Sequence, residues 1–176
     1  MDENHEWLMR EVLALERLEL TFTPIDLQTH HGLCIQFAVE STVGCPEKLY
    51  GEDGLGGQRY IQRMRDKMSA DPGSCLFVWL AGDVVGQMNL GHFNDESIGY
   101  IHFFYVVPEW RGRGVANTMA EFADEWLNQR GFTKALLSVA LDNERAVRFY
   151  LRRGWKDLGA RPDRPDLHNM EKSLGL

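Results

Sequence analysis

The chain has 176 residues, of which 44% are hydrophobic and 26% are charged, and its net charge is −7 at neutral pH. This length and composition fit one globular domain with a sizeable core. The negative charge argues against nucleic acid as a partner, and no apolar run is long enough to cross a membrane.

The first 73 residues are predicted to contain three helices, one strand and one loop. Apolar spacing of three and four indicates the helices, alternation with period two indicates the strand, and glycine-rich polar sequence indicates the loop. The helices are expected over about 1–17, from the start introduced by Pro24 and Asp26 through about Val43, and over 58–69; the strand is expected over 18–22 and the loop over 49–57.

The rest of the chain is predicted to alternate between strands and two amphipathic helices. Strands are expected over about 74–80, 84–93, 98–107, 135–141, 155–158 and 168–174, and helices over 115–130 and 143–153. The order β-α-α-β-β-β-α-β-α-β-β indicates a mixed α/β domain, with no internal repeat and no linker.

A glycine-interrupted loop, between a strand that ends at a proline and an amphipathic helix, occupies the segment 106–116. Free backbone N–H groups and the positive end of the helix dipole are expected to point at one place there. Gly112 and Gly114 leave the backbone open to an anion, and Arg111 and Arg113 add positive charge. The pattern favours a phosphate-bearing ligand, with an ordinary turn carrying exposed arginines as the alternative.

A second motif follows the strand over 135–141. Asn143 begins a helix whose apolar face includes Tyr150, and a Gly-Trp pair ends it at Trp155. The run Arg-Gly-Arg-Gly-Val-Ala over 111–116 matches the Arg/Gln-x-x-Gly-x-Gly/Ala signature of the GNAT superfamily of N-acetyltransferases, and the Asn143 segment resembles that family's second motif. The resemblance covers about residues 75–174, and earlier residues resemble the family only in element order.

The resemblance implies a fold and a division of the chain into segments. It implies a single GNAT-like α/β domain with a twisted, mixed but mainly antiparallel sheet of about seven strands and helices on both faces. We expect an N-terminal helical extension over 1–17, an acceptor side over 18–73, a core that binds acetyl-CoA over 74–158, and a C-terminal strand segment over 159–176.

The resemblance also implies an acyltransferase that moves the acetyl group of acetyl-CoA to a primary amine by direct attack in a ternary complex, without a metal. The pyrophosphate would lie on backbone N–H groups of the loop. Strands on either side of the loop and its helix splay apart in the family, so that pantetheine pairs with the exposed edge, here about 104–107. The implied coenzyme-binding residues are Val106, Val107, Arg111, Gly112, Arg113, Gly114, Val115, Ala116, Asn143 and Tyr150.

Two residues are candidates for proton transfer. Tyr150 resembles the family's general acid, and a core aromatic residue is the alternative. His102 is the candidate base, because the histidine side chain ordinarily titrates near neutrality and because His102 stands six residues before the proline, as a histidine does in some small-amine acetyltransferases of the family. Period-two alternation predicts that Tyr100 and Phe104 share its face. A structural histidine, an acidic residue or water are the alternatives for the base.

The acceptor is expected to be a small-molecule or peptide amine, and the sequence does not choose among these. A non-catalytic acyl-CoA-binding or sensor module on the same fold is the alternative function, since it needs the loop but not Tyr150. Exposed sheet edges would allow a homodimer. Cys34, Cys45 and Cys75 are too few and too scattered for a disulfide framework or a zinc site, so we expect reduced thiols in a cytoplasmic protein without a secretory signal.

Overall fold

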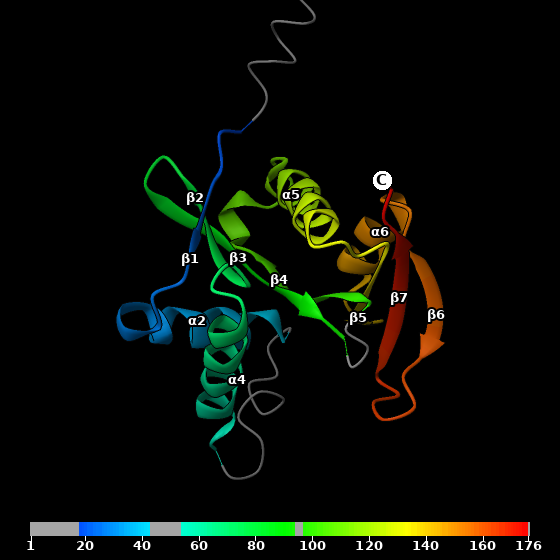
Figure 1. Ribbon diagram of the computed structural model, residues 1–176, viewed down its shortest axis with the longest axis horizontal. Coiled ribbons are helices and arrows are strands. Elements are labelled where there is room, and N and C mark those ends of the chain that lie inside the picture. The colour runs from blue at the N-terminus through cyan, green and yellow to red at the C-terminus, as the bar shows by residue number, and fades with distance from the viewer. Residues whose placement is uncertain (1–17, 43–53, 94–96, 176) are drawn as a thin grey trace, which may run out of the picture.

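The computed structural model describes residues 18–42, 54–93 and 97–175, and its strands form one seven-stranded sheet (Figure 1). The strands are β1 (Thr21–Pro24), β2 (Cys75–Leu80), β3 (Asp83–His92), β4 (Gly99–Val106), β5 (Lys134–Ala140), β6 (Lys156–Ala160) and β7 (Leu167–Ser173). The helices are α2 (Leu27–Ser41), α4 (Gly56–Ala70), α5 (Val115–Gln129) and α6 (Glu144–Arg152), with a 3₁₀ turn, η1, over Pro108–Trp110. The helix expected over 1–17 and most of the loop expected over 49–57 lie outside the described residues.

The strand order is β1-β2-β3-β4-β5-β7-β6, and every neighbouring pair is antiparallel except β4 and β5. These two strands run parallel and pair only where Gly99–Ile101 meets Ala135–Leu137. Beyond Ile101 they diverge, and a gap opens in the middle of the sheet. The predicted single α/β domain with a mainly antiparallel seven-stranded sheet is therefore confirmed.

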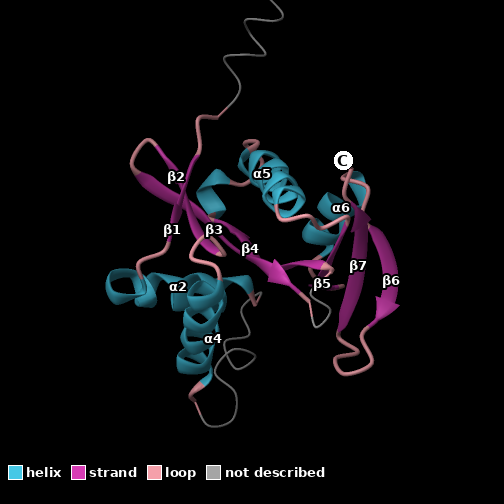
Figure 2. Cartoon of the chain, in the orientation of Figure 1, coloured by secondary structure: helices cyan, strands magenta, loops and turns pink. Residues whose placement is uncertain are grey.

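Helices cover both faces of the sheet (Figure 2). The larger core lies under α5 and α6 and includes Met119 and Trp126, which repeat at helical spacing and are at most 6% exposed. The smaller core lies under α2 and α4, around Phe77 and Met64. The predicted end of α5 is confirmed, because Gly131 follows it with a φ of +81°. None of the helices in the described part of the chain is both long and apolar enough to span a bilayer.

Strand β1 begins three residues later than the alternation in the sequence predicts. Its register is set by β2, since Thr21 lies opposite Trp79, whose indole donates a hydrogen bond of 2.8 Å to Thr23 Oγ1. The helix start that follows agrees with the prediction. Asp26 caps α2 by accepting a hydrogen bond of 2.9 Å from the backbone N–H of Gln28.

A β-bulge in β4 corrects the predicted alternation around His102. Asn89 of β3 pairs with Phe103, whereas the next residue, Leu90, pairs with Ile101, so His102 is the extra residue. One extra residue in a strand exchanges the two faces of the sheet for the side chains that come after it. His102 therefore lies on the α4 side with Tyr100, and Phe104 lies on the α6 side, with its ring 6.3 Å from that of Tyr150. The prediction that Phe104 shares a face with His102 is wrong.

Candidate active site

The loop between η1 and α5 offers a set of unpaired backbone donors. Among the described residues, the N–H groups of residues 112–116 have no backbone acceptor, and the first backbone hydrogen bond of α5 runs from Asn117 to the Gly114 carbonyl over 2.9 Å. The helix dipole adds partial positive charge at the same point. Such an arrangement can hold an anion such as a diphosphate.

The two glycines of the loop are needed for their backbone conformation. Gly112 has a φ of +74° and Gly114, the N-cap of α5, has a φ of +90°, values that side chains rarely allow. No atom lies within 4 Å of the position that a Cβ of Gly112 would take. The left-handed turns, and not a lack of space in the protein, therefore explain the glycines.

The arginines of the loop contact neighbouring protein groups. Arg111 donates from Nε to the Val106 carbonyl over 2.8 Å, and its guanidinium lies 5.4 Å from the centre of the Tyr105 ring. Arg113 lies over the Trp110 ring, also at 5.4 Å. Arg111 lines the cleft beside the loop, and Arg113 does not. Of the two arginines that the sequence predicts to face one ligand, only Arg111 lies on this cleft.

The gap between β4 and β5 is a cleft with two connected chambers. The loop chamber has a volume of about 450 Å³ and extends from the α5 loop to α6, and the strand chamber has about 290 Å³ and lies between the diverging strands. Five residues line both chambers and mark their junction: Ser41, Phe104, Asn143, Ala146 and Tyr150. The size of the loop chamber is typical of a small-molecule site.

The β4 edge that faces the gap presents Phe104 and Val106. The N–H of Val107 donates to the Val85 carbonyl of β3 over 3.0 Å. Since backbone groups alternate along a strand, the N–H and C=O groups of Val106 and Phe104 then point away from β3, toward the gap, where the Val106 C=O already accepts the hydrogen bond from Arg111 Nε. Val107 lines neither chamber. The expectation that the Val107 N–H faces a ligand is therefore wrong, whereas Val106 is where the sequence predicts.

Tyr150 lies at the junction of the chambers on the last turns of α6. Its side chain is 8% exposed, and no group among the described residues hydrogen-bonds its hydroxyl. Burial raises the pKa of Tyr150 above its ordinary value of 10.0, so the phenol stays protonated at neutral pH. Asn143 is the N-cap of α6 and accepts a hydrogen bond of 3.2 Å from the Ala146 N–H. A proton donor and a polar amide thus stand where the chambers meet.

His102 lines the strand chamber, and α4 supplies its contact. Nε2 of His102 is 2.9 Å from Nζ of Lys67 and 3.2 Å from the carbonyl oxygen of His92. The pKa of His102 falls from 6.5 to about 4, first because packed neighbours exclude water from the ring and second because of the Lys67 charge. The imidazole is therefore uncharged at neutral pH.

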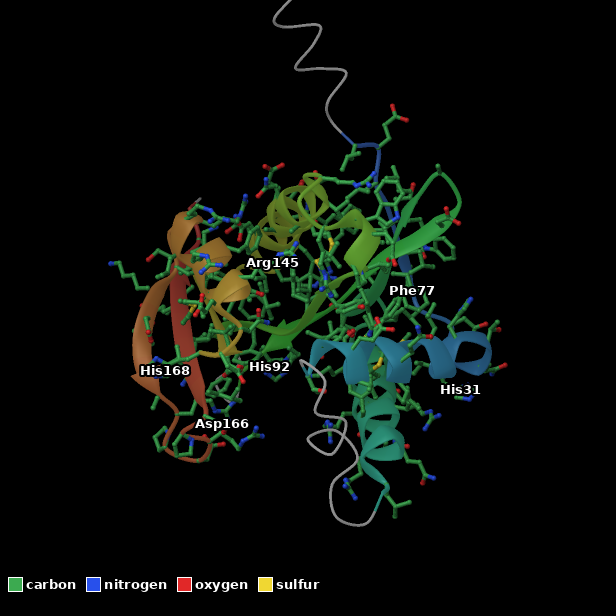
Figure 3. All side chains as sticks on the ribbon, turned by 180° about the vertical axis from the view of Figure 1, so that it is seen from behind. His31, Phe77, His92, Arg145, Asp166 and His168 are labelled. Atoms are coloured by element: carbon green, nitrogen blue, oxygen red, sulfur yellow. The ribbon has the colours of Figure 1, made fainter. Side chains whose placement is uncertain are left out.

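Three further charged residues line the loop chamber, and the sequence places the first of them, Glu40, near the acceptor. Glu40 at the end of α2 accepts hydrogen bonds from the Tyr105 hydroxyl and, over 2.8 Å, from Gln36 Nε2, and these bonds lower the pKa of its carboxyl group. Arg145 (Figure 3) and Arg152 on α6 also line the loop chamber. Their seven-residue spacing places them on one helix face, a signal available in the sequence, where both were expected to be solvated.

The strand chamber carries charges of both signs at its outer end. Arg164 and Asp166, in the connection between β6 and β7, form an ion pair of 2.8 Å and both line the chamber (Figure 3). Asp142, just before α6, lines it as well. Among the described residues, no group of three or more histidine, cysteine or acidic side chains is arranged to hold a metal ion. The site is therefore built from backbone donors, an edge strand, a phenol and an imidazole.

Comparison with known proteins places this chain in a family. Residues 34–155 match the model of the acetyltransferase (GNAT) family. An acetyltransferase of Sodalis glossinidius is 34% identical over 84 residues, which are 48% of this chain and 58% of that protein. One of Photorhabdus laumondii is 35% identical over 81 residues, or 46% of this chain and 55% of that protein. The aligned residues thus span little more than half of these curated relatives.

Solved structures share the fold at low sequence identity. PaiA N-acetyltransferase from Thermoplasma acidophilum, solved in complex with coenzyme A, superposes with a TM-score of 0.70 at 16% identity, over 88% of this chain and 99% of that one. An acetyltransferase from Thermus thermophilus gives a TM-score of 0.67, also at 16% identity, over 88% and 97%. With the family model matched over more than half of its length, the chain belongs to the GNAT family of acetyltransferases.

Proposed function

We propose that this protein transfers the acetyl group of acetyl-CoA to the primary amine of a small molecule or peptide. The observation that carries the proposal is the chain of features along one cleft. N–H groups at the α5 loop that bond no backbone acceptor in the described residues, a β4 edge that faces the gap, and a buried phenol that no described residue hydrogen-bonds follow one another from the loop chamber to the strand chamber. This order matches the diphosphate, pantetheine and thioester of an acylated coenzyme.

The residues present fit that coenzyme. The diphosphate is proposed to accept hydrogen bonds from the backbone N–H groups of the loop, including those of Gly112, Val115 and Ala116. The pantetheine amides would pair with the edge at Phe104 and Val106 as an added strand does, and Asn143 would contact them from α6. Acetyl-CoA supplies an activated acetyl group, and the protein supplies position and hydrogen bonds.

In the proposed reaction the neutral amine attacks the thioester carbonyl, so a C–N bond forms and the C–S bond breaks. Tyr150 is proposed to donate a hydrogen bond, and then its proton, to the departing thiolate. The raised pKa of its hydroxyl keeps that proton in place over the neutral range. His102 is the residue that the sequence proposes for the proton of the amine, and its contact with Lys67 decides how it can act.

A binding titration with a matched glycine variant tests the coenzyme site. Gly114→Glu places a carboxylate among the loop donors and should abolish measurable binding of acetyl-CoA by calorimetry. Gly131→Glu introduces the same side chain at a similar φ of +81°, but at the opposite end of α5, and should bind as the wild type does. Undiminished binding by Gly114→Glu contradicts the proposed site.

An amine-panel assay tests the reaction itself. The wild-type protein is incubated with acetyl-CoA and small-molecule or peptide amines, and the free thiol released is measured. We expect amine-dependent thiol release. Binding of acetyl-CoA without thiol release for any amine would instead favour a non-catalytic acyl-CoA-binding module.

A further inference from the structure

Lys67, on the last turn of α4, contacts the bulge of β4. Its Nζ lies 2.9 Å from Nε2 of His102. Gly91 makes room for this contact, because a Cβ there would lie 3.3 Å from Nε2 and 4.0 Å from Nζ. Within the described residues no carboxylate forms an ion pair with this half-buried lysine. A lysine withdrawn from water normally has such a partner, so the imidazole takes that place.

Hydrogen-bond accounting determines where the imidazole proton lies. An ammonium group can only donate, so Nε2 of His102 must accept, and the single proton of the neutral ring is then on Nδ1. The competing arrangement has Nε2–H donating to the His92 carbonyl, whose contact at 3.2 Å is longer. It would require the pKa of Lys67 to fall from 10.5 to below neutrality. Shifts of that size belong to fully buried lysines, and Lys67 is only half-buried.

We propose that Lys67 is a positioning residue that holds His102 uncharged with its proton on Nδ1, so that His102 meets the acceptor as a hydrogen-bond donor instead of a proton acceptor. The inference rests on the proposed acetyl transfer for the identity of the acceptor. It assigns Lys67 a part in the site, and it changes the role of His102 from base to donor.

The groups around the pair support an uncharged imidazole. His92 faces it from β3, the Tyr100 ring lies 4.6 Å from it within β4, and Arg63 and Cys75 act on Lys67 from α4 and β2. Burial raises the pKa of Cys75 to about 11, so this thiol carries no negative charge at neutral pH. None of these groups offers an anion that would stabilise a second positive charge beside Lys67.

The proposal has a kinetic consequence. If His102 cannot accept the proton of the amine, the amine must lose that proton to water before or during attack. Turnover at subsaturating amine should then rise with pH up to the pKa of the amine itself. A histidine base with an ordinary pKa would instead give a plateau above pH 6.5.

Nitrogen-15 NMR of the full chain tests the proposal without turnover. The imidazole signals of His102, assigned by their loss in His102→Gln, should show an Nδ1–H tautomer at pH 7 and a pKa of about 4. In Lys67→Met the pKa of His102 should rise but stay below 6.5, because burial of the ring remains, and the proton should move to Nε2 to meet the His92 carbonyl. Lys67→Gln should also raise the pKa of His102, because it removes the charge. Nε2 of His102 should remain an acceptor, since the glutamine side-chain amide can still donate a hydrogen bond to it.

Arg65→Met is the matched control. Arg65 is an exposed residue of α4 that bonds Gln62, so its variant removes the same charge without touching His102 and should leave its pKa and tautomer unchanged. A wild-type His102 pKa near 6.5, or an unchanged tautomer and pKa in both Lys67 variants, overturns the proposal. Absence of thiol release with every amine would instead overturn the proposed function and leave these spectra interpretable.

Discussion

Replacing Tyr150 with phenylalanine separates a catalytic hydroxyl from a structural one. The change removes one oxygen atom and keeps the buried ring, which packs against Trp155 and Phe149 with centroid distances of 5.8 and 5.4 Å. The change removes no hydrogen bond to any described residue. We therefore expect Tyr150→Phe to change the free energy of unfolding by less than about 0.5 kcal/mol.

The turnover of Tyr150→Phe, unlike its stability, should change strongly. Proton donation by a positioned side chain typically contributes about 10²- to 10⁴-fold, so kcat of Tyr150→Phe should fall at least about 100-fold, equivalent to about 3 kcal/mol. Affinity for acetyl-CoA should stay within about twofold, since the proposed diphosphate site is formed by the α5 loop and not by this ring. Because the pKa of Tyr150 is raised, the wild type should keep its proton donor, and hence this contribution, through pH 10.

Tyr60→Phe is the matched control. The Tyr60 hydroxyl is buried under α4 and accepts hydrogen bonds from Gln87 Nε2 over 3.0 Å and Asn89 Nδ2 over 3.2 Å. Removing this hydroxyl takes one hydrogen-bond acceptor away from two buried side-chain amides. Tyr60→Phe should therefore lower the free energy of unfolding by about 2 kcal/mol. Thiol release should be unaffected. The reasoning is refuted if Tyr150→Phe retains full turnover, or if it loses as much stability as Tyr60→Phe in denaturant unfolding.

Four further variants test the loop, the core and the surface. Gly114→Ala and Gly131→Ala should each lose about 1–2 kcal/mol of stability through their positive φ, but only Gly114→Ala should weaken acetyl-CoA binding; equal binding losses would contradict this. Met119→Ala should lose about 2–5 kcal/mol in denaturant unfolding because its side chain is fully buried; a loss below 1 kcal/mol, roughly, would argue against that packing. Asp71→Asn should cost less than about 1 kcal/mol at pH 7, since its ion pair with Arg130 is about a third exposed. The pKa of Asp71 is lowered from 3.8, so its contribution is present above pH 3.8 and should vanish as the pH falls through the folded-state value; a constant difference would contradict the linkage.

The elements predicted well are those that local sequence determines. The spacing of Val115, Met119 and Trp126, with Gly131 after the last turn, predicts α5 almost to the residue. A helix with one apolar stripe has one way to bury it, so the local pattern is sufficient. The bulge at His102 has no such local signal, because it arises from how β4 pairs with Asn89 and Leu90 of β3.

The candidate site also has one part that local sequence predicts and another that it does not. The α5 loop is contiguous in sequence, so its glycines and the helix start that follows them are enough to predict an anion site. Lys67 is 35 residues from His102, and Glu40 is 65 residues from Tyr105. Such pairs meet only because α2 and α4 pack under β4. Sequence patterns relate residues within one helix or strand, so they do not predict these contacts between elements.

The bulge explains how one strand can serve both sides of the proposed reaction. Tyr105 and His102 contact α2 and α4 through Glu40 and Lys67, on the side that we expect to receive the acceptor. Phe104 lies on the opposite face, beside Tyr150. In a regular strand His102 and Phe104 would share one face, and Phe104 would then lie on the α4 side with His102. The extra residue therefore turns Phe104 toward α6 and Tyr150, while His102 stays in contact with the cation of α4.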